Sequence, residues 1–198
     1  MNTPNKLTVA RMIAVPFFLA AFCLPFKHSY LAALIIFCLA SLTDYFDGKL
    51  ARKHGLITNF GKFLDPLADK MLTTSALLGF IALGNEHVYG ALWVAFITLL
   101  REFLVAGIRL SAVADVGKVV AANMWGKCKT VAQMAAIIFI LFTEWLETAQ
   151  LAAGHALQIM HTAGSVLLWI STLLIMMNTP SASNSSAMKS TAFPSLIP

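Results

Sequence analysis

Six long apolar stretches, each with charged residues near one end, set the hydrophobic pattern of the chain. Stretches of about 20 apolar residues are long enough to form helices that span a lipid bilayer. The pattern therefore predicts an all-α integral membrane fold with six transmembrane helices. The predicted helices cover residues 7–25, 30–48, 62–84, 88–112, 129–148 and 152–177.

The composition favours a membrane protein over a soluble one. Apolar residues make up 59% of the 198 residues and charged residues 12%, and the mean hydropathy is +0.77. A soluble domain averages roughly 45–50% apolar and about 25% charged residues. So few charges cannot cover a surface that faces water. Only the last stretch, over residues 162–177, is nearly free of charge, because the first five carry charges at one end.

The charges predict how the helices are oriented. If consecutive helices alternate in direction, all of the 14 Lys and Arg residues except Lys27 lie on the side of the N-terminus. Cytoplasmic loops of membrane proteins carry an excess of Lys and Arg, so both termini are predicted to be cytoplasmic. The opposite loops carry Glu86, His87, Glu144 and Glu147. We therefore predict a dry outer half and a polar inner half, with a cavity open to the cytoplasm.

The two terminal segments differ from the rest of the chain. Residues 178–198 are rich in Ser, Thr, Pro and Ala with one charge, which predicts a disordered tail after a membrane domain over residues 1–177. Near the start, Asn5, Thr8 and Arg11 share one side of a predicted short interfacial helix. The net charge of +5 follows from the loops of a membrane protein and needs no nucleic-acid partner.

Four aspartates lie near the predicted junction of the second and third helices. Asp44 and Asp47 are three residues apart and Asp65 and Asp69 four apart, so each pair shares a helix face. A carboxylate at mid-membrane depth costs roughly 2.5–3.5 kcal/mol, so four together need compensation. A cluster of hard oxygen ligands suits Mg²⁺ or Mn²⁺. Two such ions about 3.5–4 Å apart would suit phosphoryl chemistry.

A simpler interpretation is a belt of ion pairs with Lys49, Arg52, Lys62 and Lys70. This explains any one aspartate as well as a metal does. It explains all four less well, because small residues surround them.

Those small residues suit a ligand that comes close to the helix backbone. Gly48 and Ala51 follow Asp47, and Gly61 precedes Asp65 by four residues. The lack of a large side chain permits close approach, and the guanidinium of Arg52 can bind a phosphate in bidentate fashion.

Together these residues resemble the signature of the CDP-alcohol phosphatidyltransferases, and they match it at every position. The matching residues are Asp44, Asp47, Gly48, Ala51, Arg52, Gly61, Asp65 and Asp69. Other segments resemble one branch of the family, the bacterial phosphatidylglycerophosphate synthases. These segments are NKLTVAR at residues 5–11, LREFLVAGIR at 100–109 and WGKCKTVAQM at 125–134.

The resemblance implies a reaction and the residues that serve it. The donor would be CDP-diacylglycerol and the acceptor glycerol 3-phosphate, and CMP would leave. The four aspartates would bind two Mg²⁺ or Mn²⁺ ions, and Asp69 would be the general base. The resemblance further implies a homodimer in the bacterial inner membrane, with its active site on the cytoplasmic side. The implied CDP-binding residues are Asp47, Gly48, Ala51, Arg52, Gly61 and Asp65.

Positively charged side chains predict where the acceptor phosphate binds. A phosphate monoester carries about two negative charges near pH 7, so its pocket needs positive side chains. Arg101 follows an apolar run and is expected to face the cavity, with Glu102 as a possible partner. The other candidates are Arg109, Lys127, Lys129 and Arg11. The two lysines could also be ordinary cytoplasmic anchors, and Arg11 could equally be an anchor whose head reaches the interface.

Three alternatives stay open at this point. The chain could use another acceptor alcohol, as in cardiolipin or phosphatidylinositol-phosphate synthesis. It could be an ion-coupled transporter, although its acids gather at one face and form no relay across the bilayer. It could also be a scaffold without activity, although all four aspartates are intact.

Overall fold

The computed structural model shows six helices and no strand within the residues it describes. Its backbone is described for residues 3–24, 26, 28–54, 59–84, 86–116 and 125–177, and its side chains for 9–24, 26, 28–43, 67–68, 70–84, 86–107 and 130–177. The helices are α1 (Thr3–Cys23), α2 (Ser29–His54), α3 (Asn59–Leu83), α4 (Ala91–Val116), α5 (Trp125–Thr148) and α6 (His155–Met177).

The predicted all-α fold with six helices is confirmed, since each predicted stretch overlaps one helix. One boundary differs. The predicted interfacial helix is not a separate element, because Asn5, Thr8 and Arg11 all lie within α1. No Gly or Pro interrupts the sequence between Asn5 and Val15, so nothing there ends a helix. The predicted tail over residues 178–198 lies outside the described residues.

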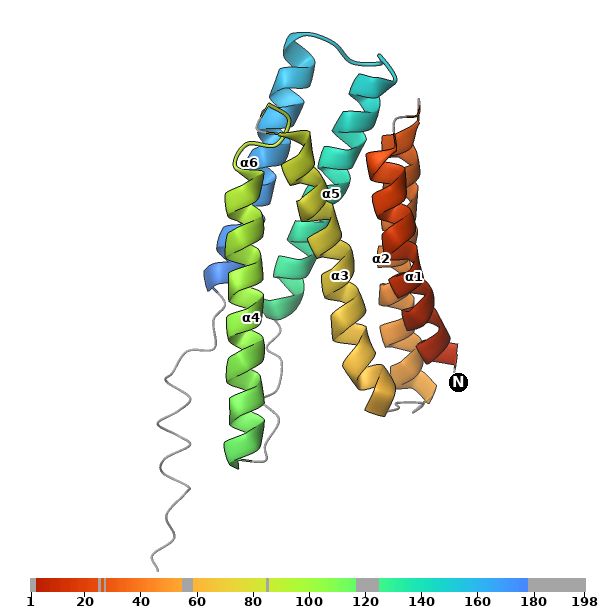
Figure 1. Cartoon of the computed structure of the whole chain (residues 1–198), viewed down its shortest axis with the longest axis vertical. Coiled ribbons are helices and arrows are strands. Elements are labelled where there is room, and N and C mark those ends of the chain that lie inside the picture. Colours follow the sequence, from red (N-terminus) through yellow and green to blue (C-terminus); the bar gives the residue numbers. More distant parts are fainter. Residues whose placement is uncertain are drawn as a thin grey trace, which may run out of the picture.

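Consecutive helices run in opposite directions and form a bundle (Figure 1). Helix α1 packs against α2 and α3, α5 packs against α2 and α6, and α4 packs against α3 and α6. We call the end at which α2 ends and α3 begins the motif end. The opposite end, which holds the α3–α4 and α5–α6 loops, is the far end.

Aromatic side chains fill the interface between the first three helices. Phe18 of α1 lies 5.9 Å from Phe37 of α2 between ring centroids, and Phe22 of α1 lies 6.3 Å from Phe80 of α3. All four rings are buried. Such pairs add about 0.5–1.5 kcal/mol each beyond the area they bury.

The α5–α6 interface depends on a small residue. A Cβ at Gly164 of α6 would lie 2.9 Å from Cγ1 of Ile140 and 3.4 Å from a ring carbon of Phe139. The contact with Ile140 is closer than a Cβ allows, so a glycine lets α6 approach α5 closely. The buried side chains of Ile137, Leu141 and Leu168 fill the same interface.

Two glycines shape the loop between α3 and α4. Gly84 follows the last residue of α3 with a φ of 89°, and Gly90 precedes α4 with a φ of 70°. Glycine adopts these left-handed angles without the steric cost that other residues incur. A Cβ at Gly90 would also lie 2.9 Å from the Trp169 ring of α6. The loop therefore lies directly against α6.

Two helical stretches are long and apolar enough to cross a membrane among the residues described, Thr130–Thr148 and His155–Met177. Three shorter apolar stretches accompany them, Val9–Cys23, Ser29–Thr43 and Lys70–Leu83. Large apolar side chains such as Phe103 and Trp93 are exposed on the outside of α4. Apolar surface of this kind marks contact with lipid or with another protein.

Substitution of Gly164 tests the close approach of α5 and α6. We expect Gly164→Leu to lower the free energy of unfolding by about 1–3 kcal/mol, because the core must shift to admit the side chain. The matched control is Gly107→Leu on α4, where an added Cβ meets nothing within 4 Å. Thermal unfolding of both variants in detergent measures the difference. Equal midpoints in the two variants would contradict this account of the interface.

Candidate functional site

The eight signature residues lie on two consecutive helices at the motif end. Helix α2 carries Asp44, Asp47, Gly48, Ala51 and Arg52, and α3 carries Gly61, Asp65 and Asp69. Their side chains lie outside the described residues. That the four carboxylates converge on one site stays a prediction.

The donor set fits the cations predicted for it. Four carboxylates offer only oxygen ligands, which suit Mg²⁺ or Mn²⁺ better than softer metals. The residues that could hold these ions are Asp44, Asp47, Asp65 and Asp69.

A polar network begins one residue after Asp69. The Nζ atom of Lys70 on α3 lies 3.1 Å from Oε2 of Glu102 on α4. The other carboxylate oxygen, Oε1, accepts a hydrogen bond of 2.7 Å from Nη1 of Arg101. Glu102 thus links α3 to α4 and leaves the three side chains with one net positive charge.

Arg101 is the buried member of this network. Its side chain is 5% exposed, against 43% for Lys70 and 28% for Glu102. This burial agrees with a position inside the bundle, and that Arg101 faces the acceptor cavity stays a prediction. Glu102 is its partner although neighbouring residues point to different sides of a helix, because the long arginine side chain reaches around the backbone. Burial of a guanidinium is expensive unless a partner compensates it, so Glu102 fixes where this charge can lie.

The burial of Arg11 bears on its two interpretations. An anchor would extend its guanidinium out of the bundle. Arg11 is 3% exposed, on a helix that packs against α2 and α3. This burial favours a role inside the bundle over an anchor, and its contact with the acceptor phosphate stays a prediction.

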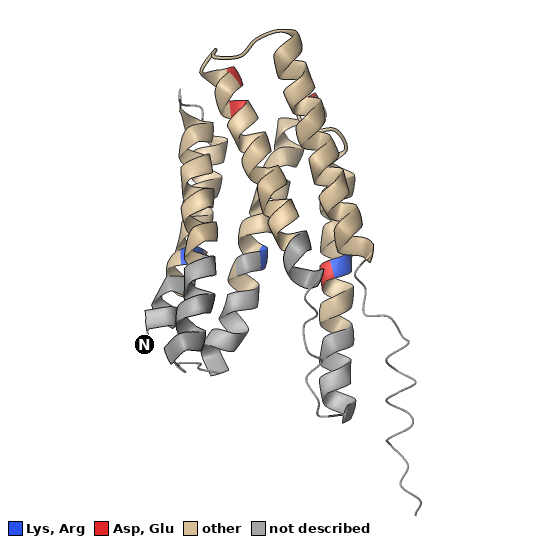
Figure 2. Ribbon diagram, turned by 180° about the vertical axis from the view of Figure 1, so that it is seen from behind, with Lys and Arg blue, Asp and Glu red and all other residues tan. Residues whose placement is uncertain are grey.

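The described Lys and Arg residues lie toward the motif end, whereas glutamates of α5 lie at the far end (Figure 2). This agrees with the predicted concentration of positive charge on one side. Three further acceptor-site candidates, Arg109, Lys127 and Lys129, have side chains outside the described residues.

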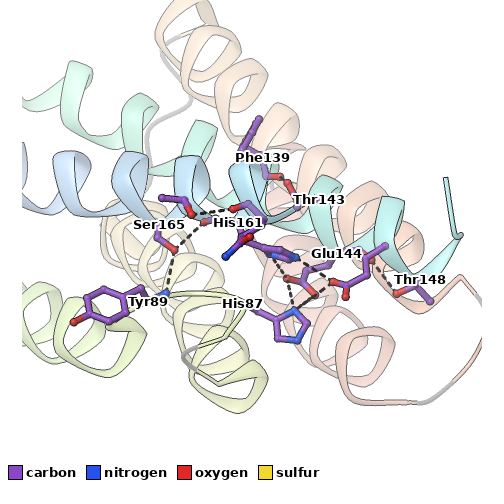
Figure 3. Close-up of polar contacts among 11 residues, drawn as sticks. His87, Tyr89, Phe139, Thr143, Glu144, Thr148, His161 and Ser165 are labelled. Carbon is purple, nitrogen blue, oxygen red and sulfur yellow. Dashed lines mark hydrogen bonds and ion pairs between the residues drawn. The ribbon is translucent and has the colours of Figure 1, made fainter. Parts of the chain in front are cut away.

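The far end is not dry, so that prediction is wrong. His87 of the α3–α4 loop, Glu144 and Glu147 of α5, and His161 of α6 form a polar group there (Figure 3). Glu144 is 2% exposed. The spacing of Glu144 and Glu147, three residues apart on one helix face, was the only sign of this group in the sequence. Its two histidines come from separate segments, which only the packing of the helices brings together.

Comparison with known proteins defines the class of the chain. Residues 1–178 match the model of the CDP-alcohol phosphatidyltransferase family. The match covers most of the sequence and includes all eight signature positions. The chain therefore belongs to the CDP-alcohol phosphatidyltransferase family.

Three individual relatives share one name. A protein of Bacillus subtilis is 43% identical over 152 residues, which cover 71% of this chain and 76% of the relative. Proteins of Escherichia coli K12 and Salmonella typhimurium are 42% and 41% identical over 158 residues, which cover 76% of this chain and 84% of each relative. All three are named CDP-diacylglycerol–glycerol-3-phosphate 3-phosphatidyltransferase.

Proposed function

We propose that this chain transfers the phosphatidyl group of CDP-diacylglycerol to glycerol 3-phosphate. The observation that carries the proposal is the complete signature on α2 and α3 in a chain 41–43% identical to relatives named for this reaction. A hydroxyl oxygen of the acceptor bonds to the phosphorus next to the diacylglycerol. The bond from that phosphorus to the bridging oxygen breaks, and CMP leaves with that oxygen.

The signature residues divide the work of binding the donor. Asp44, Asp47, Asp65 and Asp69 would hold the two divalent cations, which would supply positive charge to the pyrophosphate and to the departing CMP. Gly48, Ala51 and Gly61 leave room for the nucleotide against the helix backbones. Arg52 adds a bidentate contact to a phosphate, and Asp47 and Asp65 belong to both the metal set and the CDP set.

Asp69 is placed in the proposal as the general base. It accepts the proton of the acceptor hydroxyl as the new phosphorus–oxygen bond forms. An aspartate is an inherently weak base near neutral pH. It suffices when positioning of the two substrates supplies much of the rate enhancement.

Arg101 is the leading candidate for binding the acceptor phosphate. Its guanidinium is buried and already partnered by Glu102, so its position is set before the substrate arrives. Arg11, also buried, is the second described candidate. Arg109, Lys127 and Lys129 complete the proposed pocket by their positions in the sequence.

In the proposed setting, all six helices cross the bacterial inner membrane and the motif end faces the cytoplasm. The excess of Lys and Arg toward that end supports the orientation. The exposed apolar side chains of α4 support contact with lipid or with a second copy in a homodimer.

Release of CMP by the purified protein in detergent tests the proposal directly. We expect release that depends on Mg²⁺ or Mn²⁺, with CDP-diacylglycerol as donor and glycerol 3-phosphate as acceptor. Inositol phosphate, serine and phosphatidylglycerol serve as control acceptors. Release with one of these instead would keep the donor site and overturn the acceptor. No release with any acceptor from folded protein would overturn the enzyme and favour the transporter.

Asp69→Asn tests the general base. We expect kcat to fall by about 10²–10⁴-fold, because general base catalysis contributes a factor of that size. Binding of Mn²⁺ to the variant is measured in parallel, since Asp69 is also a proposed ligand. Near-normal turnover with the metal bound would exclude Asp69 as the base.

Arg101→Ala tests the acceptor pocket. A hydrogen bond to a charged group contributes about 1.5–3 kcal/mol, so the KM for glycerol 3-phosphate should rise by about 10–100-fold. The KM for CDP-diacylglycerol should change much less, and Arg101→Lys should recover part of the loss. Equal effects on both KM values would argue against this role.

A further inference from the structure

The polar group at the far end contains none of the signature residues. Its members are His87, Glu144, Glu147 and His161, here called the far-end cluster. The stretch of α3 from Asp69 to Leu83 alone spans about 21 Å at about 1.5 Å per residue. The far-end cluster is therefore separate from the catalytic site proposed above.

The donor atoms of the far-end cluster are spaced like the ligands of one metal ion. One nitrogen or oxygen from each residue lies within 4.8 Å of all the others. Nδ1 of His87 is 3.1 Å from Oε2 of Glu144 and 3.4 Å from Oε2 of Glu147, and Nδ1 of His161 is 3.5 Å from Oε1 of Glu144. A tetrahedral zinc ion with bonds of about 2.0–2.2 Å holds its ligands about 3.3–3.6 Å apart. Small side-chain movements would therefore admit an ion.

The charges in the far-end cluster call for a cation. Glu144 and Glu147 share one face of α5, and the side chain of Glu144 is 2% exposed while that of Glu147 is 38% exposed. A buried carboxylate is costly unless it is paired or bound to a metal. One divalent cation, held by the two imidazoles and the two carboxylates, would balance both negative charges.

One ring nitrogen of His161 makes no hydrogen bond within the described part of the chain. Its Nδ1 atom is buried and has no hydrogen-bond partner, although it lies 3.5 Å from Oε1 of Glu144. A neutral imidazole carries a lone pair on one nitrogen and a proton on the other. A metal ion uses such a lone pair, and the ring is already directed at the carboxylates (Figure 3).

Hydrogen bonds outside the cluster side chains also hold the loop that carries His87. The Tyr89 amide donates a 3.0 Å hydrogen bond to Oγ of Ser165, whose hydroxyl donates in turn to the His161 carbonyl at 2.9 Å. Nε1 of Trp169 donates to the Tyr89 carbonyl at 3.1 Å. The two imidazoles are thus positioned before any ion binds, which reduces the entropy that binding must overcome.

An ion can also reach the cluster. His87, Glu147 and His161 line an open cavity of about 590 Å³ between the α3–α4 loop and α6. Glu144 is not among the lining residues and closes the site from inside the bundle. An accessible path is one of the requirements of a genuine metal site.

We propose that the far-end cluster binds one divalent transition-metal ion, best matched by Zn²⁺, and that this ion ties the α3–α4 loop to α5 and α6. Two imidazole nitrogens and two carboxylate oxygens suit zinc, whereas Mg²⁺ takes oxygen ligands almost exclusively. Four protein ligands are typical of a structural zinc site rather than a catalytic one. The proposal does not depend on the reaction assigned to the motif end.

Zinc binding to the purified full-length protein in detergent tests this site. A large excess of Mg²⁺ is kept present to occupy the carboxylates of the signature. We expect about one tightly held zinc per chain, with imidazole scattering in the X-ray absorption spectrum of the bound metal. Zinc should also raise the thermal unfolding midpoint of the protein, because it binds only the folded chain.

Matched variants locate the ion. His87→Ala and Glu147→Gln alter the two more exposed ligands and should each weaken zinc binding by at least about 100-fold. Their controls are His155→Ala, an exposed histidine on α6, and Glu86→Gln, an exposed acid that lines the same cavity. Both controls should bind zinc like the unaltered protein. Unfolding midpoints without zinc verify that every variant is folded.

Each other outcome overturns the proposal. Failure of the unaltered protein to retain zinc would make the far-end cluster an ion-paired group without a metal. Equal zinc binding in His87→Ala, Glu147→Gln and the controls would place the ion elsewhere. Loss of zinc in Asp65→Asn, without imidazole scattering, would assign it to the signature carboxylates. None of these readouts uses CMP release, so they are independent of the proposed reaction.

Discussion

The scarcity of charged side chains in the interior of the described bundle is the constraint on which the rest of the structure depends. Each helix satisfies its own backbone hydrogen bonds, so the interior needs only apolar contacts. Phe18, Phe37 and Phe80 supply these between the first three helices. A charge among them would need a partner at the same depth. Arg101 follows this rule, because the adjacent Glu102 supplies its partner.

The two ends have different chemistry because their donor atoms differ. The motif end combines carboxylate oxygens of the signature with guanidinium and ammonium groups, which suit hard cations and phosphates. The far end combines imidazole nitrogens with carboxylates, which suit a borderline metal such as zinc. Helix α3 connects the ends, since it carries Asp65 and Asp69 in its first part and leads into the loop with His87. The helix is long enough to keep the two proposed sets of ligands apart.

The sequence predicted the number and type of the helices because residues that are costly to bury separate each apolar stretch from the next. The ends were less predictable. Helix α5 begins at Trp125 rather than near residue 129, and α1 begins at Thr3 rather than after a separate interfacial helix. In both places the helix continues into polar residues. A helix predicted from hydropathy alone ends where these polar residues begin. The burial of Arg101 was predictable from the apolar run before it. The helix that this run forms continues through Arg101, so Arg101 lies within the helix and not in the loop after it.

The two candidate sites also differ in how far the sequence predicts them. One is formed by residues close together in the sequence, and the other by residues far apart. The signature lies within 26 residues, so residue spacing alone indicated its chemistry. The far-end cluster joins residues 57 and 14 positions apart in its two closest His–Glu contacts. No periodicity connects such residues. They meet because the α5–α6 loop turns α6 back along α5, Gly164 lets the two helices approach closely, and Gly84 and Gly90 shape the α3–α4 loop that lies against α6. Two glutamates in an otherwise apolar helix were therefore read as loop charges. The burial of Glu144 and the contacts of both glutamates with His87 and His161 reverse that interpretation.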